Sequence, residues 1–146
     1  MKGGDDVRRM GVPHLSKDGT PTGETSSFLA MNRGKRSIAI DLSQPAGQQV
    51  VLDLAARADV IIENFKVGNL ARFGLDYDAV AKVNPRLVYC SITGYGQTGP
   101  DAPKPGYDFV FQGMGGLMSI TGERDDLPGG GPQKVGIAVV DIFTGM

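Results

Sequence analysis

Two short apolar runs rich in β-branched residues alternate with segments of helical periodicity, and this alternation constrains the fold more than any other feature of the chain. The runs at 59–63 and 86–92 are predicted strands. Helical patterns precede each of them, beginning at Pro45 and at Asp76 or Asp78. Because parallel strands need a long crossover connection, strands joined by helices favour an α/β fold with a parallel sheet.

Weaker patterns complete the expected elements. The β-branched run 37–41 predicts a further strand, and residues 1–33 are expected to be loop because they carry few periodic apolar residues. A short helix is expected between Val67 and Phe73, and Gly74 is expected to end it.

The second half of the chain contains one more predicted helix. Asp108 is expected to cap the start of this helix, whose apolar positions continue to Leu117. A Gly/Pro-rich loop at 125–132 follows. There is no internal repeat and no second-domain linker, so 1–146 is predicted to be a single domain.

Charge and composition exclude several functional classes. Fifteen Lys and Arg against sixteen Asp and Glu give a net charge of -1, without the basic excess of a nucleic-acid binder. No apolar run approaches the roughly 20 residues of a membrane span, and the polar start of the sequence leads us to expect no secretory signal. The single cysteine, Cys90, suits a reducing compartment. A cytoplasmic enzyme or binding protein is expected.

Candidate ligand-binding segments follow the predicted strands. Ligands of open α/β sheets bind beyond the carboxyl ends of strands, where this chain has 63–65 and 93–100. The second segment is one of several clusters among the 22 glycines, and it resembles a dinucleotide fingerprint, but Pro100 follows it instead of a helix. His14 and Cys90 are isolated, so no metal site is expected.

Asp141 lies inside the apolar run 136–143, which is unusual for a carboxylate. Its neighbours are expected to place it in poorly hydrated surroundings, and a position in the first turn of a helix would stabilise its charge. Two interpretations stay open from the residues alone. Asp141 is either a structural cap of a helix or a reactive group, such as a nucleophile that attacks an activated acyl group.

Several segments together resemble the family III CoA-transferases, also called the CaiB/BaiF family. They cover essentially the whole chain in the family's order, and they are 4–8, 32–38, 58–65, 84–100, 106–108 and 140–145. The resemblance implies a Rossmann-like parallel sheet with helices on both faces. It also implies that 1–146 is an incomplete large domain, whose first strand and partner small domain lie outside this chain. Family members form interlocked homodimers.

The resemblance implies a role for Asp141 as the catalytic nucleophile. In the family, this aspartate attacks an acyl-CoA thioester to give an aspartyl anhydride, and the CoA thiolate converts that anhydride into an aspartyl-CoA thioester. A free carboxylic acid then receives the CoA. Acyl-CoA is therefore a substrate, and no permanently bound cofactor is implied. The glycine loop that shields the intermediate in the family comes later in the sequence.

The same resemblance implies a set of CoA-contacting positions, which are Ile40, Asn64, Phe65, Arg72, Phe73 and Tyr107. Four of them have a simpler structural interpretation. The two phenylalanines and the tyrosine could be ordinary core residues, and Arg72 could lie on a solvated helix face. Ser43 also matches a contact position, but it is not basic, which argues against a phosphate contact there.

Tyr107 separates two related activities. The α-methylacyl-CoA racemases of the same superfamily carry His-Asp where this chain has Tyr107-Asp108, so a second base is missing and transfer is favoured. Short dicarboxylates such as succinate are the favoured acyl groups. A racemase or epimerase and an inactive CoA-binding fragment are the alternatives.

Overall fold

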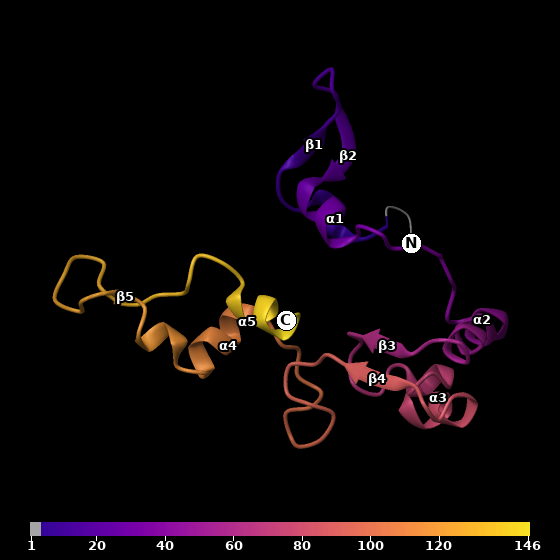
Figure 1. The fold of residues 1–146 in the computed structure, drawn as a ribbon. Coiled ribbons are helices and arrows are strands. Elements are labelled where there is room, and N and C mark those ends of the chain that lie inside the picture. Colours follow the sequence, from indigo (N-terminus) through magenta and orange to yellow (C-terminus); the bar gives the residue numbers. More distant parts are fainter. Residues whose placement is uncertain (1–3) are drawn as a thin grey trace. The chain divides into compact units, whose positions relative to one another are not determined.

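The structure, a computed structural model, describes residues 4–146 in two compact units. The first unit ends at Ala39 and the second comprises Ile40–Met146 (Figure 1). Each contains both helix and strand, and the second contains a parallel pair of strands. The predicted α/β class and parallel sheet are therefore confirmed.

The first unit is a small hairpin with flanking helices, so the prediction of a loop over 1–33 is wrong for the described part. Its elements are η1 (Asp6–Arg9), β1 (Pro13–Leu15), β2 (Pro21–Thr25) and α1 (Ser26–Met31), with β1 and β2 antiparallel. Polar contacts hold it together. The buried Thr25 hydroxyl donates to the Val7 carbonyl at 2.7 Å and accepts from the Phe28 N–H at 3.1 Å. Such contacts leave no hydrophobic periodicity, which is why the pattern missed them.

The second unit begins with the predicted helix–strand alternation. Its elements are α2 (Pro45–Ala55), β3 (Val60–Glu63), the 3₁₀ turn η2 (Ala71–Phe73), α3 (Tyr77–Val83) and β4 (Val88–Ser91). β3 and β4 are parallel, and Val60 pairs with Val88 (Figure 1). Asp76 caps α3, because its side chain accepts the Ala79 N–H at 3.2 Å. Both predicted strands and both predicted helices are confirmed.

One face of this strand pair carries the core. Ala55 of α2, Val80 of α3 and Leu87 form a buried cluster, against which Ile61 and Tyr89 pack. Side chains alternate between the faces of a strand, so the other face carries the exposed side chains of Val60, Ile62, Val88 and Cys90. The expectation that 59–63 is buried thus holds for one face only, because α2 and α3 lie on the same side.

Two local predictions are wrong. Residues 37–41 are extended but form no strand, since no other segment within 4–146 pairs with them and a lone strand gains no ladder hydrogen bonds. Instead of a helix from Val67 to Phe73, the chain makes turns and the short η2. Gly74 does end that element as predicted, with φ at +63°.

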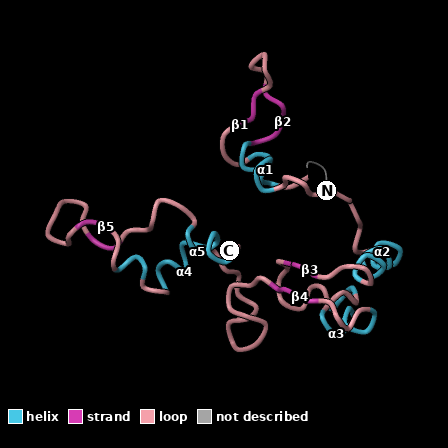
Figure 2. Tube along the Cα trace, viewed as in Figure 1, coloured by secondary structure: helices cyan, strands magenta, loops and turns pink. Residues whose placement is uncertain are grey.

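The remaining elements are short. They are α4 (Asp108–Met114), η3 (Leu117–Ser119), the antiparallel pair β5 (Gly122–Glu123) and β6 (Gly131–Pro132), and α5 (Val139–Thr144). α4 ends before Leu117 because a left-handed Gly116, with φ at +81°, starts a new 3₁₀ turn. Figure 2 shows that loops make up much of the trace between these elements. Within 4–146, no helix combines the length and the apolar character needed to cross a membrane.

Candidate functional site

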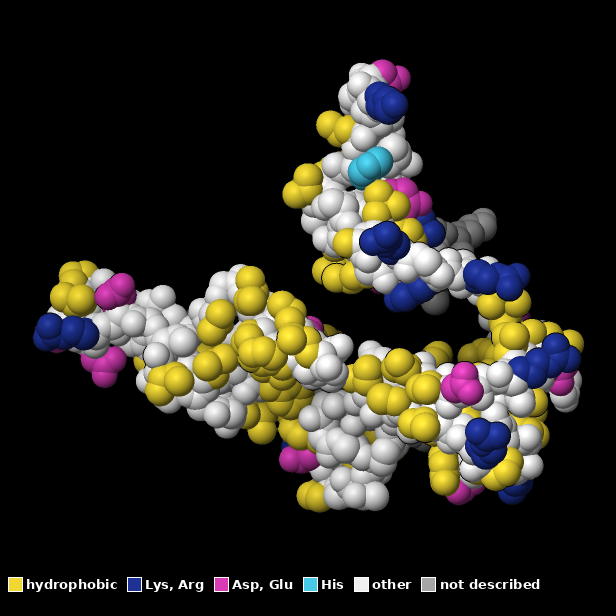
Figure 3. Space-filling view, viewed as in Figure 1, with side chains coloured by type: hydrophobic (Ala, Val, Ile, Leu, Met, Phe, Trp, Pro, Cys, Tyr) yellow, Lys and Arg dark blue, Asp and Glu magenta, His cyan; other side chains and the backbone are white. Residues whose placement is uncertain are grey.

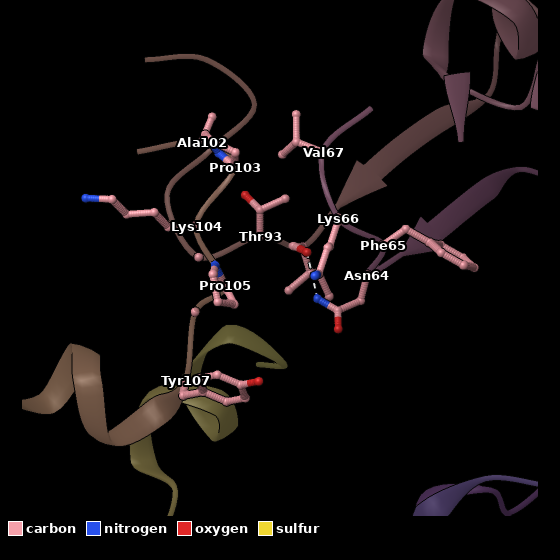
Figure 4. A pocket seen from close by; sticks show the side chains of 13 residues that line it. Asn64, Phe65, Lys66, Val67, Thr93, Ala102, Pro103, Lys104, Pro105 and Tyr107 are labelled. Carbon is pink, nitrogen blue, oxygen red and sulfur yellow. Dashed lines mark hydrogen bonds between the residues drawn. The ribbon is translucent and has the colours of Figure 1, made fainter. Parts of the chain in front are cut away.

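A cavity of about 250 Å³ opens beyond the carboxyl ends of β3 and β4, at the edge of the sheet where a ligand is expected (Figure 4). Three predicted CoA-contacting residues line it: Asn64, Phe65 and Tyr107. Segments that follow both strands thus meet the loop that precedes α4. The structure brings these three positions together although Tyr107 is far from the others in the sequence.

Asn64 ties the two strand ends to each other. Its Nδ2 donates to the carbonyl of Ile92 at 2.7 Å, the interaction drawn in Figure 4. The next residue, Phe65, has its N–H bound to a Glu63 carboxylate oxygen at 2.7 Å. Its ring is 46 % exposed and is directed away from Pro103 and Pro105 in Figure 4, so Phe65 is not the core residue of the simpler interpretation.

Two glycines bring the Tyr107 loop against the end of β4. A Cβ atom on Gly106 would lie 2.5 Å from the Cα of Gly94 and 2.6 Å from the ring of Phe111. A Cβ on Gly94 would likewise lie 2.7 Å from the Cα of Gly106. Only glycine allows this crossing, because any side chain would overlap backbone atoms. Tyr107 follows directly and is 69 % exposed, which rules out a buried aromatic role within this unit.

The charges around this cavity favour an anionic ligand. Lys66 and Lys104 contribute to its lining, which contains no carboxylate. Lys104 Nζ lies 2.6 Å from the Asp101 carboxylate, which raises the pKa of the lysine and offsets part of its charge. The positive charge of the lining therefore comes mainly from Lys66.

A second cavity, of about 400 Å³, shares Lys66 with the first and has the opposite character. Glu63, Asp76 and Asp78 all contribute carboxylates to it. Carboxylates repel phosphate groups, so this cavity is a poorer candidate for the polyphosphate part of CoA. Within 4–146, no group of three or more His, Cys, Asp and Glu side chains is arranged to hold a metal ion.

Asp141 lies in the first turn of α5 and is exposed, so the expected poorly hydrated surroundings are wrong for this unit. Its apolar neighbours Ile142 and Phe143 are themselves 47 % and 69 % exposed. Apolar side chains gather over α4 and α5 in Figure 3. An apolar sequence neighbour excludes water from a carboxylate only when it is itself packed, and these two are not.

Asp108 caps a different helix from the one predicted. Its Oδ2 accepts the N–H groups of Val140 at 2.7 Å and Asp141 at 3.1 Å, at the start of α5. α4 itself begins at Asp108 and has no side-chain cap. The prediction missed this contact because it joins residues more than thirty positions apart.

The three other predicted contact positions are not among the residues that line the 250 Å³ cavity. Arg72 is exposed on η2, with its guanidinium carbon 5.6 Å from the centre of the Phe73 ring. Ile40 is half-buried, and its side chain faces Gly47 of α2.

One buried polar residue next to Asp141 was not predicted. Gln112 of α4 is fully buried, and its amide connects Asp108 to the loop before α5. The available signal was its spacing, four residues after Asp108, which places both side chains on one helix face. That signal is weak, because a glutamine at such a position is usually a surface residue.

Comparison with known proteins gives a consistent result. The family model described as CoA-transferase family III matches residues 1–146. The succinate–glutarate CoA-transferase of Agrobacterium fabrum is 52% identical over 145 residues, which are 99% of this chain and 35% of that protein. The human succinyl-CoA:glutarate CoA-transferase is 42% identical over 143 residues, 98% of this chain and 30% of that protein. The chain therefore spans about a third of the length of these relatives.

A solved structure agrees in fold. The crystal structure of a CaiB/BaiF family protein from Brucella suis matches with a TM-score of 0.84 and 51% identity. The match covers 99% of this chain and 36% of that one.

Proposed function

The chain belongs to CoA-transferase family III, and from this membership we propose that it supplies the nucleophile and part of the CoA site of an enzyme that moves CoA from an acyl-CoA to a free carboxylic acid. Acyl-CoA and the acid are substrates in this proposal, and no permanently bound cofactor takes part. The rest of the enzyme would come from sequence outside 1–146.

One observation carries the proposal. Tyr107 lines the cavity at the strand ends, and the next residue, Asp108, accepts the N–H of Asp141 at 3.1 Å. A single loop therefore connects the basic cavity to the one carboxylate that the family resemblance identifies as the nucleophile. A thioester whose CoA portion occupies the cavity would be held on the same side of the unit as α5.

The proposed chemistry starts with the Asp141 carboxylate. One of its oxygens attacks the thioester carbonyl, the C–S bond breaks, and CoA leaves as the thiolate, giving a mixed anhydride. The thiolate then attacks the aspartyl carbonyl of that anhydride, which releases the donor acid and forms an aspartyl-CoA thioester. The acceptor carboxylate displaces the thiolate to form a second anhydride, and the thiolate finally takes the new acyl group and restores Asp141.

Water must be excluded during these steps, because an anhydride hydrolyses. Asp141 is exposed in 40–146. We therefore propose that shielding comes from other parts of the enzyme, namely the glycine loop and the second subunit of an interlocked homodimer. In the same way, 1–146 would be an incomplete Rossmann-like large domain, and its missing first strand would complete the sheet beside β3.

Binding of CoA is assigned to the predicted contact positions. Asn64 and Phe65 would border the pantetheine, and Lys66 and Lys104 would attract the phosphates. Arg72 and Phe73 would hold the adenine end through the cation and ring that already lie together. Ile40 would add an apolar contact.

The substrate proposal follows from the relatives. Two of them are named for succinate or succinyl-CoA and glutarate. We propose short dicarboxylates as donor and acceptor acids, and the cytoplasm, where CoA thioesters of this kind are available, as the compartment.

The test is to trap the intermediate in the full-length protein. Incubation with succinyl-CoA and hydroxylamine should convert Asp141 into a hydroxamate, detected by peptide mass spectrometry. Asp141→Asn should lower the transfer rate at least about 1,000-fold, because it removes the nucleophile. Asp125→Asn, which changes an exposed aspartate in the β5–β6 hairpin, is the control and should leave both results unchanged.

Other outcomes would replace the proposal. Full activity in Asp141→Asn would exclude the covalent mechanism. Deuterium entering the carbon next to the thioester, without any acceptor acid, would instead indicate a racemase. CoA binding without either reaction in the full-length protein would leave only a binding role.

A further inference from the structure

The two most buried polar side chains of the second unit are those of Gln112 and Asp108. They lie on one face of α4 and contact the start of α5 and the loop before it. Gln112 is 0 % exposed and Asp108 is 6 % exposed. Gln112 Nε2 donates a hydrogen bond to Asp108 Oδ1, so the two side chains act as one group. Buried polar groups are costly unless they are fully paired, and these are paired on every side.

The partners of this pair form the approach to Asp141. Gln112 Oε1 accepts the N–H of Val135 at 2.8 Å, and its Nε2 also donates to the carbonyl of Ile137 at 3.1 Å. Asp108 Oδ2 accepts the N–H groups of Val140 and Asp141. The pair therefore holds the chain at four successive points between Val135 and Asp141.

α5 depends on this support. It has six residues, and its N-cap residue Ala138 has no side chain that can accept a hydrogen bond. Helices this short are unstable alone, and their first N–H groups need outside acceptors. Asp108 supplies that acceptor for two of them, one of which belongs to Asp141 itself.

We propose that Asp108 and Gln112 are positioning residues that set the direction of the Asp141 carboxylate. This inference rests on the proposed function, because it assumes that Asp141 is the nucleophile. The backbone N–H of Asp141 is bound by Asp108, so the Cα–Cβ bond of Asp141 has a defined starting direction. Gln112 orients the Asp108 carboxylate toward the start of α5, and it anchors the loop before α5 at Val135 and Ile137. Neither side chain reacts.

The test changes the pair without changing its size, in the full-length protein. Asp108→Asn places an amide where the charged acceptor stood. Whichever way this amide turns, its NH2 group faces a donor, either Gln112 Nε2 or the N–H groups of Val140 and Asp141. The substitution should lower kcat about 100-fold, the loss expected for a displacement of about 1 Å at a reacting group, with KM for succinyl-CoA changed less than about 3-fold. Adding Gln112→Glu gives the new amide an acceptor, although the carbonyl of Ile137 then loses its donor. This double substitution should therefore recover part of the lost kcat, at least about 3-fold.

The control is another glutamine–aspartate pair, on α2. Gln49 and Asp53 on α2 are also four residues apart and make the same amide–carboxylate hydrogen bond, at 2.8 Å, but they are exposed. Asp53→Asn should leave kcat and KM unchanged. Circular dichroism of all variants shows which ones are folded. If Asp108→Asn does not fold, Gln112→Met serves as the second variant, because it keeps the approximate size of the side chain and removes its amide without adding a buried charge. It is also expected to lower kcat.

A readout independent of activity is hydrogen exchange in the full-length protein. The amide hydrogens of Val140 and Asp141 should exchange with solvent at least about 10-fold faster in Asp108→Asn than in the parent chain, because their acceptor is altered. Unchanged exchange, or faster exchange with kcat unchanged, would overturn the positioning role. Full activity in Asp141→Asn would overturn the proposed function first, so the two failures are distinguishable.

Discussion

The crossing of Gly94 and Gly106 leads to a sharp prediction about the cavity. Gly106→Ala adds one methyl group at the point where two backbone segments meet. That methyl carbon would lie 2.5 Å from the Cα of Gly94 and 2.6 Å from a ring carbon of Phe111. Ordinary contacts between carbon atoms are about 3.5 to 4.0 Å long, so both contacts are too short by about 1 Å.

The size of the effect follows from this overlap. Adding a methyl group to a packed region costs about 1–3 kcal/mol when neighbours must move, and backbone atoms move less easily than side-chain ends. We therefore expect Gly106→Ala to lower the free energy of unfolding of the second unit by about 2–3 kcal/mol. The loop must also shift by about 1 Å, which moves Tyr107 away from the strand ends and weakens CoA binding at least about 10-fold.

Urea unfolding followed by tyrosine fluorescence measures the first effect, because the chain has four tyrosines and no tryptophan. Isothermal titration with CoA in the full-length protein measures the second. Gly136→Ala is the matched control, since nothing lies within 4 Å of its added Cβ and its φ is not positive. If Gly106→Ala and Gly136→Ala have the same urea midpoint, the close crossing is not a feature of the folded protein and the argument fails.

Three further changes have simple expected outcomes in urea unfolding of the chain. Asn84→Ala should cost about 1–3 kcal/mol, because its Nδ2 donates to two carbonyl oxygens at and after the end of α2, at 3.0 and 2.9 Å; an unchanged midpoint would contradict this. The pKa of Tyr89 is raised by burial and by the carboxylates of Glu63 and Asp76, so the folded state keeps a proton that the unfolded state loses above about pH 10. Stability should therefore fall as the pH rises from about 10, and Tyr89→Phe should remove this part of the fall. Gly113→Ala should stabilise α4 by about 0.5–1 kcal/mol, because its Cβ would meet only Met118 Sδ, at 3.8 Å; any loss of stability would contradict this.

Local patterns predicted the helix–strand alternation well. α2, β3, α3 and β4 lie where the periodicity of apolar residues and the capping signals at Pro45 and Asp76 placed them. These elements share the core of Ala55, Val80 and Leu87. The periodicity of apolar residues predicts them because it marks the side chains that are buried in such a core. The first unit was missed because hydrogen bonds of Thr25 hold it, and such bonds leave no periodic trace.

The site was predicted in part. The strand-end rule directs attention to residues 63–65 and 93–100, and Asn64, Phe65, Thr93 and Gly94 of these segments line the cavity. Tyr107, which only the family resemblance indicated, lines the same cavity. The predicted poorly hydrated surroundings of Asp141 are not found within residues 40–146, because hydration depends on which side chains pack over a group and not on which precede and follow it. Gln112 gave no usable signal, since its burial depends on the loop that folds back onto α4.

The sequence by itself determined the α/β class, the family and the residue types available for chemistry, because these depend on local periodicity and on the order of short motifs along the chain. Tertiary structure alone decided that two glycine backbones cross beside the cavity and that Asp108 caps α5 instead of its own helix. Both are contacts between segments distant in the sequence, and their energy comes from a geometry that exists only when the chain is folded.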